Sequence, residues 1–242
     1  MAKNTFDRSS LRLSAMLLLG GQLLYVVITL LHTGGEANHH AVIFAAYAAS
    51  ATWTAVHVAQ FACMAIMLAG LLALFSAMDS PTGTARLTAR LGAASTTATL
   101  ALYGVVLAVD GVALKQAVGA WATAPDAEKA ARFAAAETMR WLEWGARSYE
   151  NFTLGLAVLF AAAVVRTALI PRPIAYLMVL SALTYFAQGW LAGAEGFSQT
   201  HTSAIILAEL LNAAWMTWLL IAAWRIPHSE SASDRLKGPG IR

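Results

Sequence analysis

The chain has 242 residues, of which 59% are hydrophobic and only 12% are charged, with a formal net charge of +3. Soluble domains are about 45–50% apolar and about 25% charged, so this composition excludes an ordinary soluble protein and indicates an integral membrane protein. The single cysteine, Cys63, excludes a disulfide, a CxxC redox pair and a thiolate metal cage within one chain. The small positive charge comes mostly from loops, which reflects membrane topology and gives no support to nucleic-acid binding.

Six apolar segments, separated by breaks rich in Ser, Thr, Gly or Pro, are long enough to cross a bilayer, which takes about 20 residues per helix. The predicted spans run over residues 11–31, 53–78, 91–114, 152–170, 174–193 and 203–224. The sequence therefore predicts an all-α fold, a polytopic membrane helical bundle that forms one domain over residues 1–226. The polar segment over residues 227–242 is expected to be a disordered cytoplasmic tail.

Two further helices are expected on one side of the membrane. Asn38 is placed to cap a short interfacial helix that ends near Ala49. Thr123 and Asp126 form a capping-box pattern ahead of an alanine-rich segment, which predicts an outer-face helix over residues 123–145 that runs on into the fourth span. Ion pairs at i,i+4 spacing favour this helix: Glu128 with Arg132, and Glu143 with Arg147.

Lysine and arginine residues are concentrated in the N-terminal segment, the loops that follow the second and fourth spans, and the C-terminal tail. Cytoplasmic loops carry an excess of these residues, so both termini are predicted to be cytoplasmic. The histidine-rich segment over residues 32–49 then faces outward. The expected localisation is the cytoplasmic (inner) membrane, with a multi-pass topology.

Polar and titratable side chains lie in the outer halves of the spans, whereas the inner halves have almost none. A charged group near the bilayer centre costs at least about 2.5–3.5 kcal/mol, so each one needs a partner or a function. Several spans contribute polar groups to the same leaflet, which predicts one outward-facing polar pocket. The residues predicted to form it are His32, His57, Gln60, Asp110, Lys115, Trp144, Gln188, Glu195, His201, Glu209 and Asn212.

Three of these residues have the chemistry of a catalytic group. His57 is the best general base because imidazole titrates near neutral pH, Glu209 is the best proton donor, and Asp110 adds a third polar contact. Structural interpretations stay open beside these roles. Asp110 has Lys115 close by in sequence as a partner for an ion pair, and His57 has the surroundings of a packed histidine that bonds a carbonyl.

Three classes of function remain open. The favoured one is an outward-facing pocket that binds or modifies a small hydrophobic or amphipathic ligand, since the repeats and broken midplane helices typical of transporters are not evident. The second is a metal- or haem-dependent membrane oxidoreductase or hydrolase, with His32, His57 and His201 as candidate metal ligands and the last two as axial haem ligands. The third is a non-catalytic subunit that binds another membrane protein through its outer helix. The lipid bilayer is an expected partner, and no nucleic acid is expected to bind.

Four sequence patterns resemble a family of bacterial six-span integral membrane proteins of unknown function. They are AASxxWxxxHxxxF at Ala48–Phe61, LAGLLAL at Leu68–Leu74, DGVALKQAV at Asp110–Val118 and RWLEWG at Arg140–Gly145. The resemblance implies a six-helix membrane bundle. It assigns no catalytic residues, so it does not decide among the three classes.

Overall fold

The structure, a computed structural model, describes residues 7–78, 83–168 and 170–226. These residues form helices joined by short connections, and none of them is in a strand. The predicted tail over residues 227–242 lies outside the described residues. In chain order the elements are α1 (Arg8–Thr29), α2 (His40–Ala49), α3 (Trp53–Ala77), α4 (Gly83–Ala108), the π-helix η1 (Val109–Leu114), α5 (Lys115–Ala122), α6 (Asp126–Thr167), α7 (Arg172–Glu195) and α8 (Gln199–Arg225).

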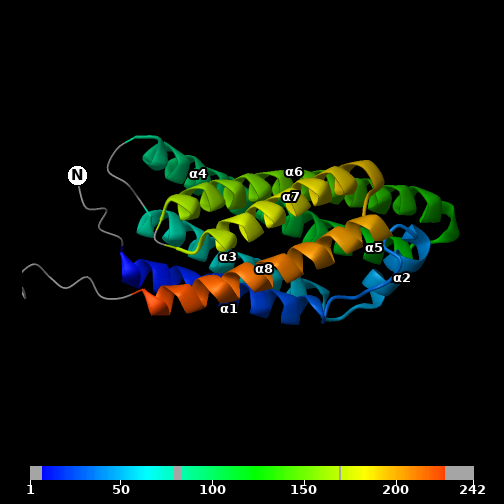
Figure 1. The fold of residues 1–242 in the computed structure, drawn as a ribbon. Helices are drawn as coiled ribbons and strands as arrows, with labels where there is room; N and C mark the ends of the chain where they lie inside the picture. Colours follow the sequence, from blue (N-terminus) through cyan, green and yellow to red (C-terminus); the bar gives the residue numbers. More distant parts are fainter. Residues whose placement is uncertain (1–6, 79–82, 169, 227–242) are drawn as a thin grey trace, which may run out of the picture.

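Six helical segments are long and apolar enough to cross a membrane: α1, α3, the continuous α4–η1–α5 segment, α6, α7 and α8. This confirms the predicted all-α bundle with six spans and a shorter helix. Each span packs against the next one in sequence, and α1 contacts α8, so the six form a closed ring (Figure 1). The third segment is longer than the predicted 91–114, because helix continues at both ends through residues that composition alone places outside the span. The fourth is one continuous helix, as predicted for an outer-face helix that runs on into the span.

The two ends of the bundle differ in composition. One end, which we call the basic end, is where α1, α4 and α7 begin and α3, α6 and α8 end (Figure 1). Arginines mark these helix termini: Arg8, Arg12, Arg86, Arg90, Arg166, Arg172 and Arg225. The opposite end, which we call the cavity end, holds the connection from α1 through α2 to α3, and it carries the histidines of the described residues.

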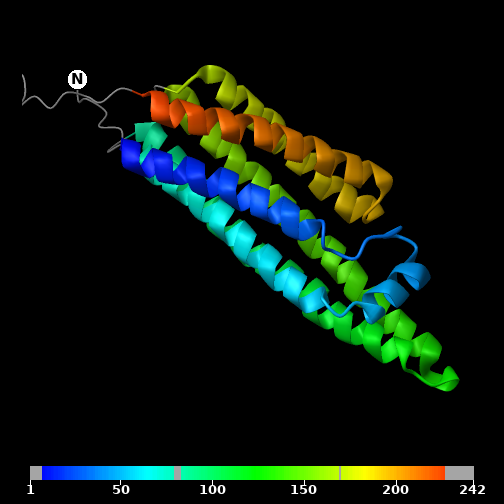
Figure 2. The same cartoon turned by 90° about the horizontal axis from the view of Figure 1, so that it is seen from below.

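The helix α6 has 42 residues and is therefore about 63 Å long, roughly twice the hydrocarbon thickness of a bilayer. Its first half pairs with α5, and this hairpin extends past the ends of α7 and α8 at the cavity end (Figure 2). The short helix α2 packs on the hairpin. A separate apolar cluster holds the two together: Ile43, Phe44, Tyr47, Trp53, Leu114, Val118 and Ala136.

Both predicted capping interactions are wrong in detail. The α2 helix begins at His40 without a side-chain cap, and Asn38 instead donates a hydrogen bond to the Glu195 carbonyl at 2.9 Å. The α6 helix begins after Pro125, also without a side-chain cap. Thr123 instead caps the end of the preceding helix α5, and its hydroxyl donates to the Gly119 carbonyl at 3.1 Å. In both places the side chain that the local pattern assigns to the helix start bonds a different part of the chain. Asn38 bonds a carbonyl at the end of α7, and Thr123 bonds a carbonyl of the preceding helix.

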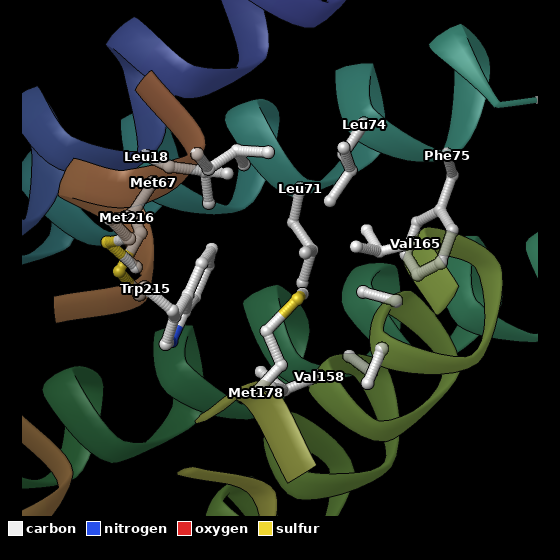
Figure 3. Close-up of a cluster of buried hydrophobic side chains, with 14 of the residues drawn as sticks. Leu18, Met67, Leu71, Leu74, Phe75, Val158, Val165, Met178, Trp215 and Met216 are labelled. Carbon is white, nitrogen blue, oxygen red and sulfur yellow. The ribbon is translucent and has the colours of Figure 1, made fainter. Parts of the chain in front are cut away.

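The main hydrophobic core lies toward the basic end and joins all six spans. Figure 3 shows Leu71 facing Met178 across the centre of the bundle, with Trp215 and Met216 of α8 beside them. Two of the helices, α1 and α3, approach at glycines, and small residues are what allow such close backbone contact in membrane bundles. At this crossing Ser14 donates a hydrogen bond to the Gly70 carbonyl at 2.7 Å.

Candidate functional site

A cavity of about 960 Å³ lies at the cavity end of the bundle, between the spans. Its walls come from α1 and the connection after it, and from α3, η1, α6, α7 and α8. Its charged and amide-bearing lining consists of Gln22, His32, Glu36, Asn38, Gln60, Asp110, Arg140, Glu143, Arg147, Glu150, Asn151, Gln188, Gln199, His201 and Glu209. Thus the polar groups that the sequence scatters over six segments lie around one space.

The structure places the predicted site residues in two groups. Those that line the cavity are His32, Gln60, Asp110, Gln188, His201 and Glu209. Those that do not line it are His57, Lys115, Trp144, Glu195 and Asn212. His57 contacts Asp110, which itself lines the cavity, whereas the side chains of the remaining four residues have other partners.

These four residues support the walls of the cavity. Asn212 lies deeper in the bundle, where its amide donates to the Tyr185 hydroxyl at 2.6 Å. The ring of Trp144 packs beside Phe197, with 6.2 Å between ring centroids. Glu195 accepts a hydrogen bond from the Ser198 hydroxyl at 2.9 Å, next to the start of α8. Lys115 holds α2 in place.

Lys115 donates three hydrogen bonds to main-chain carbonyls at the C-terminal end of α2. Its Nζ lies 2.7 Å from the Tyr47 oxygen, 2.9 Å from that of Ala48 and 2.7 Å from that of Ser50. The predicted pairing of Lys115 with Asp110 is therefore not found. The lysine instead satisfies carbonyls that a helix end leaves without partners, and it joins α5 to α2.

The Lys115→Met variant is expected to loosen α2 while the spans stay folded. Hydrogen bonds to charged groups contribute about 1.5–3 kcal/mol, so losing them should raise local opening by roughly 30-fold if the net loss is about 2 kcal/mol. Hydrogen–deuterium exchange of residues 40–50 measures this opening. Lys129→Met is the control, since Lys129 makes one exposed bond to the Ala122 carbonyl. Equal exchange rates in the two variants would contradict the capping role.

The largest feature that sequence reasoning missed is a row of buried ion pairs on α6. Arg140 binds Glu143 at 2.7 Å, and one heptad later Arg147 binds Glu150 at 3.4 Å. Arg140 and Glu143 are only 2% and 1% exposed. The pairs have i,i+3 spacing, not the predicted i,i+4 pairing of Glu143 with Arg147. The repeated Arg-x-x-Glu pattern could have revealed them, because residues seven apart lie on one helix face.

Arg140 also holds together the elements next to the cavity that we call the lid, which are the α1–α2 connection, α2 and the α7–α8 connection. Its guanidinium donates to the Ala37 carbonyl and to the Tyr47 hydroxyl, each at 3.3 Å. It lies 4.7 Å from the centre of the Phe197 ring, within the range of a cation–π contact. Burial raises the pKa of Tyr47 to about 12, so its hydroxyl stays protonated at neutral pH. One arginine thus connects α6 with the α1–α2 connection, α2 and the α7–α8 connection.

A third buried polar pair joins α3 to η1. His57 Nε2 lies 2.9 Å from Asp110 Oδ2, and His57 Nδ1 lies 2.7 Å from the Trp53 carbonyl oxygen. The Trp53 indole in turn donates to the Asp110 carbonyl at 3.0 Å. The packed-histidine interpretation therefore describes one side of His57. Its other side faces a carboxylate that lines the cavity.

His32 stands next to this pair, whereas His201 does not. The His32 ring lies 5.0 Å from that of His57 and 4.9 Å from that of Trp53, centroid to centroid. Burial lowers the pKa of His32, which favours the neutral imidazole. Ligand atoms of His32, His57 and Asp110 all lie within 4.8 Å of one another. His201 stacks on Phe197 instead, so the predicted set of three histidines is not assembled.

The carboxylate of Glu209 lines the cavity from α8 and accepts a hydrogen bond from the Gln22 amide of α1. Within the described ranges, Glu209 makes no ion pair with a cation from another span. Asp110 and Glu209, two of the three predicted catalytic groups, therefore border the same space. His57, the third, reaches that space only through Asp110.

No protein-family model matches this chain, and comparisons with curated proteins and with solved structures find no match.

Proposed function

We propose that this protein, which has the helices of a multi-pass membrane protein, binds a small amphipathic molecule in the cavity between its spans. The observation that carries the proposal is that the cavity has a charged wall on η1 and α6 and an apolar opening on α1 and α8. The polar end of the ligand would contact the charged wall, and its apolar part would lie in the opening. A volume of about 960 Å³ is at the upper end of the usual range for small-molecule sites.

The charged wall has polar atoms that the described residues leave without partners. Glu150 Oε1, Asn151 Nδ2 and Asp110 Oδ1 are buried, and none of them makes a hydrogen bond in the described part of the chain. All three residues line the cavity. Buried polar atoms in native proteins usually have a partner, so these atoms support the binding of a polar group at this wall.

The opening is aliphatic and lies between two neighbouring spans. Val26 of α1 and Leu30, which follows α1, line the cavity together with Ile205 and Ile206 of α8, and all four are exposed. Helices α1 and α8 are neighbours in the ring (Figure 2). In a bilayer such exposed aliphatic side chains contact lipid tails, so an amphipathic molecule could enter sideways from the membrane.

A tryptophan at the opening is expected to exclude the ligand. In the Ile206→Trp variant the larger side chain would fill the opening, and overpacking of about 1–3 kcal/mol corresponds to roughly 5- to 150-fold weaker binding. The measurement is mass spectrometry of small molecules extracted from protein purified out of its native membrane in mild detergent. Leu210→Trp is the matched control, because Leu210 lies one turn further along α8, is 65% exposed and does not line the cavity. If both variants retain as much co-purified molecule as the wild type, the proposal is wrong.

The orientation of the chain is part of the same proposal. The concentration of arginine at the basic end supports cytoplasmic termini in the inner membrane, with the cavity end outside. Fusions of alkaline phosphatase and of green fluorescent protein to the C-terminus test this. We expect fluorescence and no phosphatase activity, and the reverse pattern would overturn the assignment.

A further inference from the structure

We propose that His32, His57 and Asp110 form a binding site for a divalent transition-metal ion, with Zn²⁺ as the fitting example. The site shares Asp110 with the charged wall described above, but it does not use the ion pairs of α6. Its three ligands do not require an amphipathic molecule to be bound, so either proposal can fail without the other.

Three ligand atoms from three separate parts of the chain converge at this site. His32 follows α1, His57 is on α3 and Asp110 is on η1, yet their ligand atoms lie within 4.8 Å of one another. Imidazole nitrogen and carboxylate oxygen are ligands that Zn²⁺ accepts. Three protein ligands with one open position is the arrangement of zinc sites that keep a coordinated water.

The hydrogen bonds of His57 also favour a cation at this site. The Trp53 carbonyl can only accept, so His57 Nδ1 must donate the hydrogen of their 2.7 Å bond. In the neutral ring this leaves Nε2 with a lone pair, and Nε2 lies 2.9 Å from the Asp110 oxygen, which is also an acceptor when ionised. Two acceptors at this distance need a proton or a cation between them. A bond from the distal nitrogen to a carbonyl is also the usual support of a metal-bound histidine.

The second carboxylate oxygen of Asp110 lacks a partner among the described residues. Asp110 is 6% exposed, and its Oδ1 is buried and makes no hydrogen bond in the described part of the chain. Both Asp110 and His32 line the cavity, so an ion at this position would be reached from it. The cavity would also supply the water of the open position.

The surroundings keep the three ligands close. A Cβ built on Gly111 would lie 2.7 Å from the Cβ of His57, so only glycine lets η1 approach α3 this closely. The rings of Tyr47 and Trp53 pack against His32. Zinc bond lengths of 2.0–2.2 Å place tetrahedral ligand atoms about 3.3 Å apart, so the His57–Asp110 contact needs to widen by only about 0.4 Å. His32 needs to move about 1.5 Å closer at most.

The test is the binding of Co²⁺ and Zn²⁺ to the full chain, purified in detergent and treated with a chelator. Co²⁺ in a site with few ligands gives visible absorption bands, and Zn²⁺ should displace it. We expect one ion per wild-type chain. His32→Phe keeps a ring against Trp53 and Tyr47 but removes the ligand nitrogen, and it should weaken binding by at least about 100-fold, since even supporting residues account for 10–100-fold.

Two further histidine variants serve as controls in this titration. His39→Phe changes an exposed histidine outside the cluster and should bind Co²⁺ like the wild type. His201→Phe changes a cavity histidine that is not in the cluster, and it should also leave binding unchanged. The proposal is overturned if the wild type binds no stoichiometric ion, if His32→Phe binds as tightly as the wild type, or if His201→Phe abolishes binding. Thermal unfolding of each variant without metal shows that it is folded.

Discussion

Replacing Arg140 with methionine is expected to lower the free energy of unfolding by about 3–5 kcal/mol, because it leaves the Glu143 carboxylate buried without its partner. Both side chains are almost inaccessible to solvent, and their 2.7 Å ion pair lies on α6 in the wall of the cavity. The variant also loses the hydrogen bonds to the Ala37 carbonyl and the Tyr47 hydroxyl. Thermal unfolding in detergent measures the loss, and the α1–α2 connection should become accessible to protease.

A double variant and a surface control show whether burial is the cause. Arg140→Met combined with Glu143→Leu removes both charges, and apolar replacement of a whole buried pair is often close to neutral, so it should recover most of the loss. Arg132→Met breaks an ion pair whose partners are 52% and 53% exposed, and it should cost less than about 1 kcal/mol. If Arg140→Met is no more harmful than Arg132→Met, the ion pair on α6 does not support the site.

The second large effect is expected at the crossing of α1 and α3. A Cβ built on Gly21 would lie 2.7 Å from the Met67 backbone nitrogen, and one built on Gly70 would lie 2.7 Å from the Leu18 backbone nitrogen. Main chain cannot move aside as a flexible side chain can. Gly21→Leu should therefore separate the helices and lower stability by about 2–3 kcal/mol, or roughly 5–10 °C in Tm for a chain of this size.

The adjacent glycine provides the control for this effect. A Cβ on Gly20 would meet nothing within 4 Å, so Gly20→Leu should leave Tm unchanged or raise it, because leucine favours helix over glycine. The comparison is informative because the two variants have the same composition and hydrophobicity. Equal Tm values for the two would show that the close approach of α1 and α3 is not needed for stability.

Hydropathy was sufficient for the six spans because the membrane requires each crossing segment to be apolar and internally hydrogen-bonded. It did not predict that the third helical segment continues to Ala122, or that the polar part of α6 is buried. Residues 140–151 of α6 look like a solvent-facing helix by composition, yet Arg140, Glu143 and Glu150 are buried against neighbouring elements. A hydropathy average counts a charge as fully polar even when a partner on the same helix face neutralises it, so it does not reveal that the pair is buried.

The sequence predicted the depth of the polar residues in the candidate site, but it did not predict which residues they contact. Asp110 and Glu209 border one cavity, as expected for polar groups at similar depth in different spans. The partner of Asp110 is His57 and not Lys115, and nothing in the local sequence distinguishes the two. Which of the two residues Asp110 meets depends on η1, the π-helix from Val109 to Leu114. Neither a proline nor a change in hydropathy marks this π-helix in the sequence.

The π-helix also divides the 40-residue apolar segment Gly83–Ala122 into two helices that no single helical wheel describes. Each extra residue in a helix shifts the angular phase of all later residues by about 100°. Tyr103, before η1, faces the core of the bundle, whereas Lys115 and Val118, after it, face α2. Deleting one residue within η1 would therefore rotate α5 away from α2 while α4 kept its contacts. Insertions and deletions in this one turn would therefore change the orientation of α5 and α2 relative to the bundle, although the hydrophobicity of the segment would stay the same.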